Sequence, residues 1–345
     1  MMKMVCFAGV GIFLLIFPYI FPLPFPQHIM IMIFVYATLA QAWNILGGYT
    51  GQCSLGHAVF FGCGAYTSSL LLIQFGLNPW LGMLAGAILA VGLSLLVAIP
   101  CFRLAGHYFA IATIAIGEIC QIGMVNWKGG GGANGLYLPI LEEGFLNLEF
   151  HNTKVPYYYI ALGIAAITFA AVFFLERSFL GYYFRAIKGD LDASRAAGIN
   201  VARYKTVALA ISAFFTSIAG TFYAQYVLFI DPESVLPLML SVLISLVAIL
   251  GGVASVWGPF LGAAVLIPLS EFTRTYLGGR GTAVDLRARS ILGVGLFILF
   301  LLLRSAFLGT LENPEPRYTL ECYPIAILLG SALFHKNRLN SDFRL

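Results

Sequence analysis

The sequence predicts an all-α protein: a polytopic transmembrane helix bundle of about eight to ten spans, with broken or re-entrant helices. The 345 residues are 60 % hydrophobic and only 10 % charged, whereas a soluble domain carries about 25 % charged residues. Long apolar runs recur along the chain, and glycine-rich segments interrupt them. The net charge of +4 is dispersed, which suits loops that face membrane lipid and does not indicate a nucleic-acid partner.

Ten apolar runs are candidate spans, because a helix needs about 20 apolar residues to cross a bilayer. The connections at 22–27, 74–78 and 251–256 are short and uncharged, so neighbouring spans are expected to be antiparallel. The first run lacks a small-residue cleavage site, and we expect it to remain as a span or signal anchor. The ten runs are 4–21, 28–46, 54–73, 79–102, 106–125, 155–175, 206–230, 237–250, 257–277 and 290–304.

The six cysteines lie mostly within or beside apolar runs and lack the paired spacing of a zinc site or a disulfide framework. We interpret them as small apolar packing residues. The sequence also has no Walker-type motif and no convincing catalytic set, so the chain cannot hydrolyse ATP alone. We expect a transport subunit without a catalytic site, metal or other cofactor.

Two polar loops predict the orientation of the chain. Residues 176–205 carry six Lys or Arg, whereas residues 126–154 carry three Glu and two Lys. The positive-inside rule therefore places 176–205 in the cytoplasm and 126–154 outside. With ten spans, the loop 278–289 falls outside although it carries three Arg. Either the 237–277 pair is partly re-entrant or the rule fails there.

The cytoplasmic loop contains a predicted short helix. Asp190 is a good N-cap, Leu191–Ala197 consists mostly of good helix formers, and Gly198 can adopt the left-handed C′ conformation. One interpretation is a solvated basic loop that only orients the chain. The other is a docking element that a partner protein binds.

Two glycine-rich breaks, 47–57 and 251–259, interrupt the early and the late spans. Paired breaks of this kind indicate a transport site, because unwound backbone can face a cavity but not lipid. The two segments share only their Gly-Gly start, so internal duplication stays an open alternative. Gln52, Ser54 and His57 of the first break are candidate pathway residues, with a satisfied interior histidine as the alternative for His57.

Glu118 is the acidic residue that lies well inside an apolar run. A carboxylate at this depth is costly, so it marks either a pathway or a paired structural site. Gln121 and Asn126 lie three and eight positions further on, on roughly the same helical face. We therefore expect these three residues to line or gate a pathway, or to hold a structural hydrogen bond or ion pair.

Several long motifs, in order, resemble those of the membrane subunits of branched-chain amino acid ABC importers. The resemblance covers about residues 30–304. The motifs are Gly47–Ala58 with Phe61–Tyr66, Tyr108–Ile119, Gly131–Pro139, Arg185–Tyr204, and Gly251–Pro259 with Gly262–Ala264. We therefore divide the chain into a permease domain, 1–304, and a C-terminal tail, 305–345, whose role stays open.

The resemblance implies a complex in a bacterial-type inner membrane. This chain and a second homologous permease subunit would form the pathway, two cytoplasmic ATP-binding subunits would drive it, and an extracytoplasmic solute-binding protein would deliver substrate. Branched-chain amino acids are the expected substrates, with urea, short amides or other amino acids as alternatives. The segment 190–198 is similar to a loose ABC coupling motif, which implies ATPase-coupling roles for Asp190, Asp192, Ala193, Arg195 and Gly198.

Two other classes of protein stay open at this point. A stand-alone secondary transporter would use Glu118 for proton coupling and would need no ATPase. An integral-membrane enzyme would need a convergent catalytic set, for which His57 and Glu118 are the dispersed candidates. Transport without ATP would favour the first class.

Overall fold

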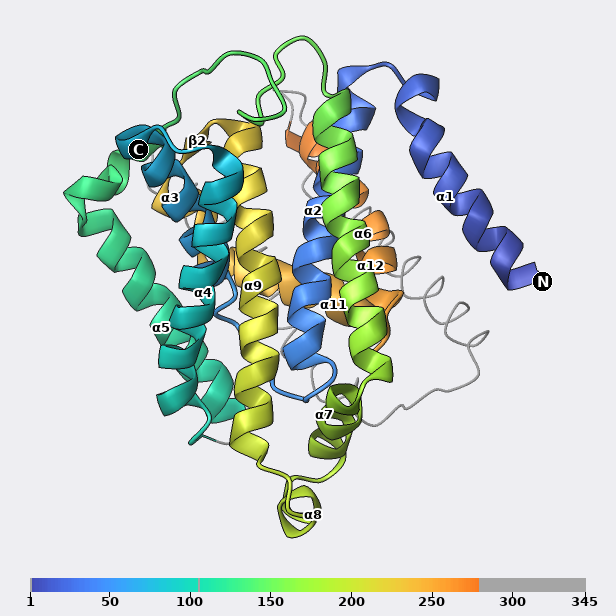
Figure 1. Cartoon of the computed structure of the whole chain (residues 1–345), viewed down its shortest axis with the longest axis vertical. Helices are drawn as coiled ribbons and strands as arrows, with labels where there is room; N and C mark the ends of the chain where they lie inside the picture. Colours follow the sequence, from blue (N-terminus) through green and yellow to red (C-terminus); the bar gives the residue numbers. More distant parts are fainter. Residues whose placement is uncertain (1, 105, 279–345) are drawn as a thin grey trace. The chain divides into compact units, whose positions relative to one another are not determined.

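The computed structural model describes the fold of residues 2–104 and 106–278, and most of these belong to one compact unit, Met1–Arg274. The elements are α1 (Met2–Ile20), α2 (Pro24–Gly47), α3 (Ala58–Phe75), α4 (Pro79–Cys101), α5 (His107–Asn126), η1 (Lys128–Gly130), η2 (Gly132–Asn134), β1 (Leu136–Tyr137), α6 (Val155–Arg177), α7 (Phe179–Gly189), α8 (Leu191–Ala196), α9 (Val201–Val227), β2 (Phe229–Ile230), α10 (Pro232–Val235), α11 (Leu238–Gly251) and α12 (Gly258–Gly278). The predicted all-α bundle is therefore confirmed (Figure 1).

Helices α3, α4 and α9 pack closely against one another, because small residues let their backbones approach. Ser217 of α9 occupies the space beside Gly64 of α3, and the Phe61 carbonyl of α3 occupies the space beside Gly220 of α9. Gly86 of α4 lies against Gly64 on the other side. A side chain at any of these glycines would push the helices apart.

Helix α1 is tied to α6 through a carbonyl that its own helix cannot satisfy. Pro18 has no N–H, so the Leu14 carbonyl four residues earlier lacks its helical donor. The Tyr158 hydroxyl of α6 donates to this carbonyl at 2.7 Å, and the neighbouring Tyr159 hydroxyl donates to the Leu15 carbonyl at 2.8 Å. The two tyrosines thus hold α1 at the level of its proline.

Seven helical segments are long and apolar enough to cross a membrane within the described residues. They agree with the expected runs to within about five residues at each end, and the largest shifts have local causes. The run expected at 54–73 begins at Ala58, because residues 48–57 are irregular. The run 206–230 begins earlier, at Val201, where the Asn200 side chain accepts the Arg203 N–H. The run 290–304 and the tail 305–345 lie outside the described residues.

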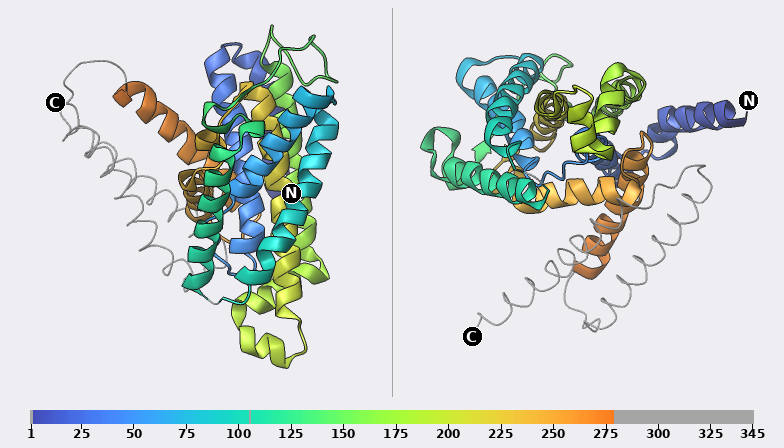
Figure 2. Two further views of the ribbon diagram at one scale, coloured as in Figure 1. Left: turned by 90° about the vertical axis from the view of Figure 1, so that its left-hand side faces the viewer. Right: turned by 90° about the horizontal axis from the view of Figure 1, so that it is seen from below.

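Helix α11 differs from the other apolar helices in its direction. Its axis runs across those of α2 and α9 rather than beside them (Figures 1 and 2). It is only 14 residues long, and it reaches the 20 residues or so that a span requires only together with α10, as Pro232–Gly251. This geometry favours the first of the two alternatives for the 237–277 pair, a partly re-entrant segment.

The two polar loops lie at opposite ends of the bundle (Figure 1). Helix α6 starts directly after the loop 126–154 and leads to α7 and α8 at the other end. At the loop end, β1 pairs antiparallel with β2, with Leu136 opposite Ile230. The segment that follows α9 therefore closes the same end of the bundle as the loop 126–154.

Candidate transport pathway and coupling segment

The two glycine breaks lie together in the structure, although 210 residues separate Asn44 from Ala254. The Asn44 side chain joins them: its Nδ2 donates to the Ser255 carbonyl at 2.9 Å, and its Oδ1 accepts the Ala254 N–H at 2.8 Å. Gly48 lies so close to the Asn44 side chain and to the Ala254 nitrogen that a Cβ would not fit there. One buried amide thus pairs backbone groups that the broken helix leaves without a partner.

The first break is a folded segment rather than a loose loop. The Trp43 Nε1–H of α2 donates to the Ser54 carbonyl at 2.7 Å, and the Leu55 N–H donates to Thr113 Oγ1 of α5 at 3.0 Å. Irregular backbone is tolerated at membrane depth only where such partners exist or where it lines a cavity. A small cavity does lie beside it, lined by Ser54 and Thr113 among residues of α3, α4, α5 and α9.

His57 lies at the start of α3 with its side chain fully buried. Its Nε2 is 2.8 Å from Ser212 Oγ of α9, and its Nδ1 is 3.1 Å from Ser54 Oγ. Next to it, Ser241 of α11 accepts the Ala58 N–H at 2.8 Å, one of the helix-start donors that have no intrahelical partner. Both ring nitrogens have partners, so the geometry favours the satisfied interior histidine over a pathway group. Gln52, the remaining candidate, is also largely buried.

The three candidates on α5 do not form a cluster. Asn126 is exposed and its Nδ2 donates to the Ile122 carbonyl one turn earlier at 2.8 Å. Glu118 and Gln121 are half-buried. Within the described residues no hydrogen bond or ion pair joins Glu118 to another group. The inward face of α5 instead carries the buried Thr113, whose Oγ1 accepts the Leu55 N–H.

Helix α8 has the predicted caps. Asp190 Oδ1 accepts the N–H groups of Asp192 at 2.8 Å and of Ala193 at 3.0 Å. The N–H groups of Ala193 and Asp192 also hold the pKa of the Asp190 carboxyl below its usual range. Gly198 follows the helix with φ +82°, the left-handed region, and the Ile199 N–H donates to the Ser194 carbonyl at 3.0 Å.

The exposed surface of α8 coincides with the candidate coupling residues. Asp192, Ala193 and Arg195 are exposed, and Arg195 Nη1 lies 3.0 Å from Asp192 Oδ1. Ser194 is the buried residue of this helix, and its Oγ donates to the Asp190 carbonyl at 2.7 Å. The helix projects from the end of the bundle that holds α7 (Figure 1).

Helix α7 was not predicted from the sequence. Its eleven residues form an amphipathic helix that buries Gly181, Phe184 and Ile187. Phe184 packs in the same apolar cluster as Tyr49, which follows α2. The spacing of three residues between Phe184 and Ile187 is typical of an amphipathic helix. The six Lys and Arg residues of the segment 176–205 made it resemble a polar loop instead.

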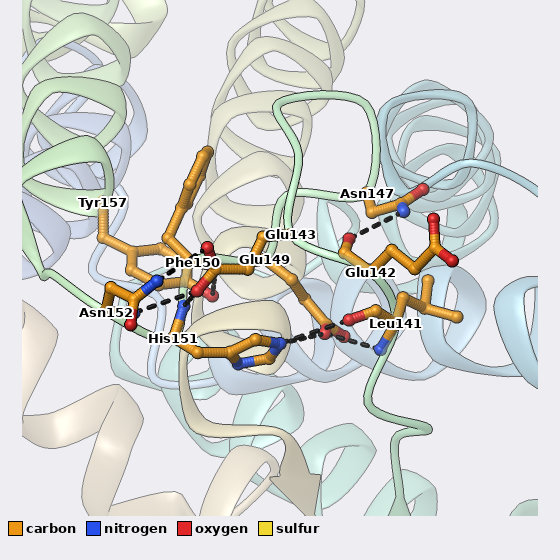
Figure 3. Close-up of polar contacts among 9 residues, drawn as sticks. All are labelled: Leu141, Glu142, Glu143, Asn147, Glu149, Phe150, His151, Asn152 and Tyr157. Carbon is orange, nitrogen blue, oxygen red and sulfur yellow. Dashed lines mark hydrogen bonds and ion pairs between the residues drawn. The ribbon is translucent and has the colours of Figure 1, made fainter.

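The loop at the opposite end is ordered by its own carboxylates (Figure 3). Glu143 Oε1 accepts the His151 N–H at 2.7 Å and the Asn152 N–H at 3.0 Å. Glu149 is fully buried, its Oε2 accepts the Leu141 N–H at 2.6 Å, and His151 Nε2 lies 3.6 Å from the same oxygen. Burial raises the pKa of the Glu149 carboxyl, while the Leu141 N–H and His151 oppose this. The acidic residues thus serve this loop's own fold.

Residues 25–306 match the family described as branched-chain amino acid transport system / permease component. The chain belongs to this permease family. It is 28 % identical, over 81 % of its length and 69 % of the relative's, to the high-affinity branched-chain amino acid transport system permease protein LivM of Escherichia coli strain K12. To LivH of Salmonella typhimurium it is 24 % identical, over 81 % of its length and 92 % of the relative's. No solved structure matches the chain.

Membership confirms the resemblance seen in the sequence motifs and gives the protein a permease role. With its apolar helices, the chain is an integral membrane protein. The relatives include both LivM and LivH, each named as a permease protein of a high-affinity branched-chain amino acid transport system. Within residues 11–104 and 106–271, the side chains form no group of three or more His, Cys, Asp or Glu that could hold a metal ion.

Proposed function

We propose that this permease forms half of the translocation pathway of an ATP-driven importer for branched-chain amino acids in a bacterial-type inner membrane. A second, homologous permease subunit would supply the other half. Two cytoplasmic ATP-binding subunits would drive transport, and an extracytoplasmic solute-binding protein would deliver the amino acid. The observation that carries the proposal is α8, a short helix with both ends capped that projects from one end of the bundle with its candidate coupling residues exposed.

A capped helix of this kind suits docking into a groove of a partner protein. The Asp190 cap and the left-handed Gly198 hold its shape before a partner binds, so docking costs little ordering entropy. An orienting basic loop would need only its Lys and Arg residues, not defined helix ends. The caps therefore favour a docking element for a partner protein over a loop that only orients the chain.

Helix α5 is the proposed wall of the pathway. In the described structure its outward face packs on no other helix of this chain, and Ile111, Ile119 and Ile122 are 61 %, 69 % and 59 % exposed. Glu118 lies at the edge of this face without a partner from the described residues. A carboxylate in a membrane span needs water or a partner group, and the second permease subunit or a water-filled pathway would supply it.

Reconstitution tests the proposal directly. The chain is co-expressed with a second family permease and two ATP-binding subunits, purified, and placed in vesicles with the solute-binding protein on the outside. We expect uptake of labelled leucine, isoleucine and valine that requires ATP and the binding protein. Labelled urea and acetamide in parallel distinguish the alternative substrates. Uptake driven by a proton gradient in vesicles that hold this chain alone would overturn the ATP-driven assignment in favour of a secondary transporter.

Variants of α8 test the coupling assignment. Gly198→Val forces a β-branched residue into the left-handed region, at a cost of about 1 kcal/mol or more, and Asp192→Lys reverses a charge on the exposed face. We expect both variants to insert and to pair with the second permease, yet to lose ATPase recruitment. Gly163→Val of α6 is the matched control, since no atom lies within 4 Å of a Cβ there. Normal recruitment and transport in both α8 variants would contradict the coupling role.

Cysteine labelling tests the proposed orientation. Ala196 of α8 and Leu146 of the opposite loop are exposed, so a single cysteine at either position is accessible to a membrane-impermeant maleimide. In a cysteine-free background, Leu146→Cys is expected to label from outside and Ala196→Cys only after the membrane is opened. The reverse pattern would invert the orientation, and labelling of both from one side would contradict the bundle topology.

A further inference from the structure

The coupling end of the chain is joined to the first glycine break by a polar contact that the proposed function does not use. Tyr49 follows α2 and opens the break, and its side chain is only 1 % exposed. Its hydroxyl donates to Glu176 Oε2 at 3.4 Å. Glu176 lies at the end of α6, directly before the turn into α7. Burial, and secondly the Glu176 carboxylate, raise the pKa of Tyr49, so this hydroxyl keeps its proton.

Arg185 of α7 completes the contact from the other side. Its Nη2 donates to the Glu176 carbonyl at 2.6 Å, and its Nη1 lies 3.8 Å from Glu176 Oε1. Its Nε donates to the Gly181 carbonyl at 3.4 Å. One arginine therefore ties the end of α6 to α7, and the same glutamate receives Tyr49. Bonds to charged groups are stronger than those between neutral groups.

Apolar packing reinforces this contact beneath the polar groups. Phe184 and Ile187 of α7 are 0 % and 1 % exposed, and Phe184 packs in one cluster with Tyr49 and with Leu46 at the end of α2. Close to them, a Cβ at Gly51 would lie 3.9 Å from the Cβ of Lys188 in α7. The break thus packs against α7 in this cluster and, one turn further on, at Lys188.

The break in turn leads to the interior of the bundle. Three residues before Gly47, Asn44 bonds the second break at Ala254 and Ser255. Ser54 and Leu55 bond α2 and α5. A chain of contacts thus connects α7 to both breaks.

We propose that Tyr49, Glu176 and Arg185, which we call the α7 junction, position the first glycine break on α7, so that movement of α8 by an ATP-binding partner moves the break. The inference rests on the proposed function and deepens it. These three residues are positioning residues: they would not touch substrate or nucleotide. Their role is to make ATP hydrolysis productive.

Tyr49→Phe isolates the hydroxyl, because the ring keeps its apolar neighbours. In the reconstituted complex we measure amino acid transported per ATP hydrolysed, together with ATPase recruitment and the ATP hydrolysis rate. We expect normal recruitment and hydrolysis, with transport per ATP lowered by about two- to tenfold, the range that loss of one hydrogen bond produces. A merely structural role would lower the amount of complex and both rates together, and leave their ratio unchanged.

Tyr182→Phe is the matched control. Tyr182 lies on α7, is 64 % exposed, and contacts Arg185 with its ring rather than its hydroxyl. This variant is expected to transport as much amino acid per ATP hydrolysed as the native complex. If the native complex recruits ATPases and transports, but Tyr49→Phe leaves transport per ATP unchanged, the inference about the α7 junction is overturned and the proposed function is not. A native complex that neither recruits ATPases nor transports overturns the proposed function instead.

A cross-link provides an independent measurement. Gly51→Cys with Lys188→Cys places two Cβ atoms about 3.9 Å apart, within the 3.5–4.5 Å or so of a disulfide. In Tyr49→Phe, without the six native cysteines, oxidation is expected to restore transport per ATP, and reduction to lower it again. Gly51→Cys alone controls for the positive φ of +73° at this glycine. A disulfide that forms yet leaves the ratio low would show that the break must move apart from α7, and would overturn the inference.

Discussion

Helices α5 and α9 are similarly apolar, yet they occupy opposite environments. Fifteen residues of α9 are buried, whereas α5 buries only Phe109 and Thr113. Hydropathy does not distinguish the two helices, because lipid and the protein interior are similarly apolar. The placement of small residues separates the two helices: Gly220 and Ser217 of α9 contact α3, whereas the glycines of α5 have open space around them.

The difference concerns what each helix can contact. A helix with small residues along one face allows close backbone approach and is held from all sides by its own chain. A helix whose large apolar side chains point outward presents them to lipid or to another subunit. Helix α5 is of the second kind, and it also carries Glu118. We therefore expect substitutions in α9 and its neighbours to affect folding, and substitutions on α5 to affect transport.

The largest expected effect is that of Gly64→Val at the crossing of α3 and α9. Its Cβ would collide with the Ser217 backbone, and such overpacking costs about 1–3 kcal/mol, occasionally more. Gly117→Val in α5 makes the same change where no atom lies within 4 Å. Thermal unfolding of the detergent-solubilised protein, followed by fluorescence, is expected to show a strongly lowered midpoint for Gly64→Val and little change for Gly117→Val. Equal midpoints would remove the distinction between the two helices.

Glu118 comes next, with an effect on transport rather than folding. Glu118→Gln is expected to leave the complex assembled and to lower ATP-dependent uptake by about tenfold or more, since a bond to a charged group is worth upward of about 1.4 kcal/mol. Glu118→Leu removes the polar group altogether and should lower uptake at least as far. If Glu118→Leu transports like the native protein and is equally stable, neither a pathway role nor a buried pair can be assigned to this residue.

The features that were predicted best are those that depend on residues adjacent in the sequence. Most span boundaries and the caps of α8 follow from local hydrophobicity and from Asp190 and Gly198, and the structure agrees with both. The direction of α11 could not be predicted, because an apolar 14-residue helix has the same composition whether it lies along or across a bundle. The only indirect sign was that the loop 278–289, with its three Arg, falls outside if every apolar run spans the membrane.

The candidate site was less predictable, because its contacts join distant parts of the chain. Asn44 lies in an apolar run and gives no sign of the bonds to Ala254 and Ser255 that unite the two breaks. The partners of His57 come from three residues before it and from Ser212, 155 residues away. Such pairings depend on the packing of helices, which a single sequence does not encode as a motif.

Two carboxylates show the same contrast as α5 and α9. Glu149 is enclosed by its own loop, where Leu141 and His151 contact it, whereas no described residue pairs with Glu118. Burial raises the pKa of Glu149, so the folded loop binds a proton more readily than the unfolded loop does. The free energy that holds the loop closed is then greatest below the usual carboxylate pKa of about 4.3 and falls as the pH rises through the raised pKa.

Glu149→Gln is expected to have the smallest effect, confined to this loop. The glutamine oxygen can still accept the Leu141 N–H, and the amide does not titrate. Hydrogen-exchange protection of the Leu141 and Gly144 amides, corrected for the intrinsic rate, is measured from pH 4 to pH 8 for both proteins. In the native loop protection should fall with rising pH more steeply than in Glu149→Gln, and because His151 is present in both, the difference isolates Glu149. Identical pH dependence in the two proteins would mean that the carboxylate is equally solvated in the open and closed loop, contrary to its burial.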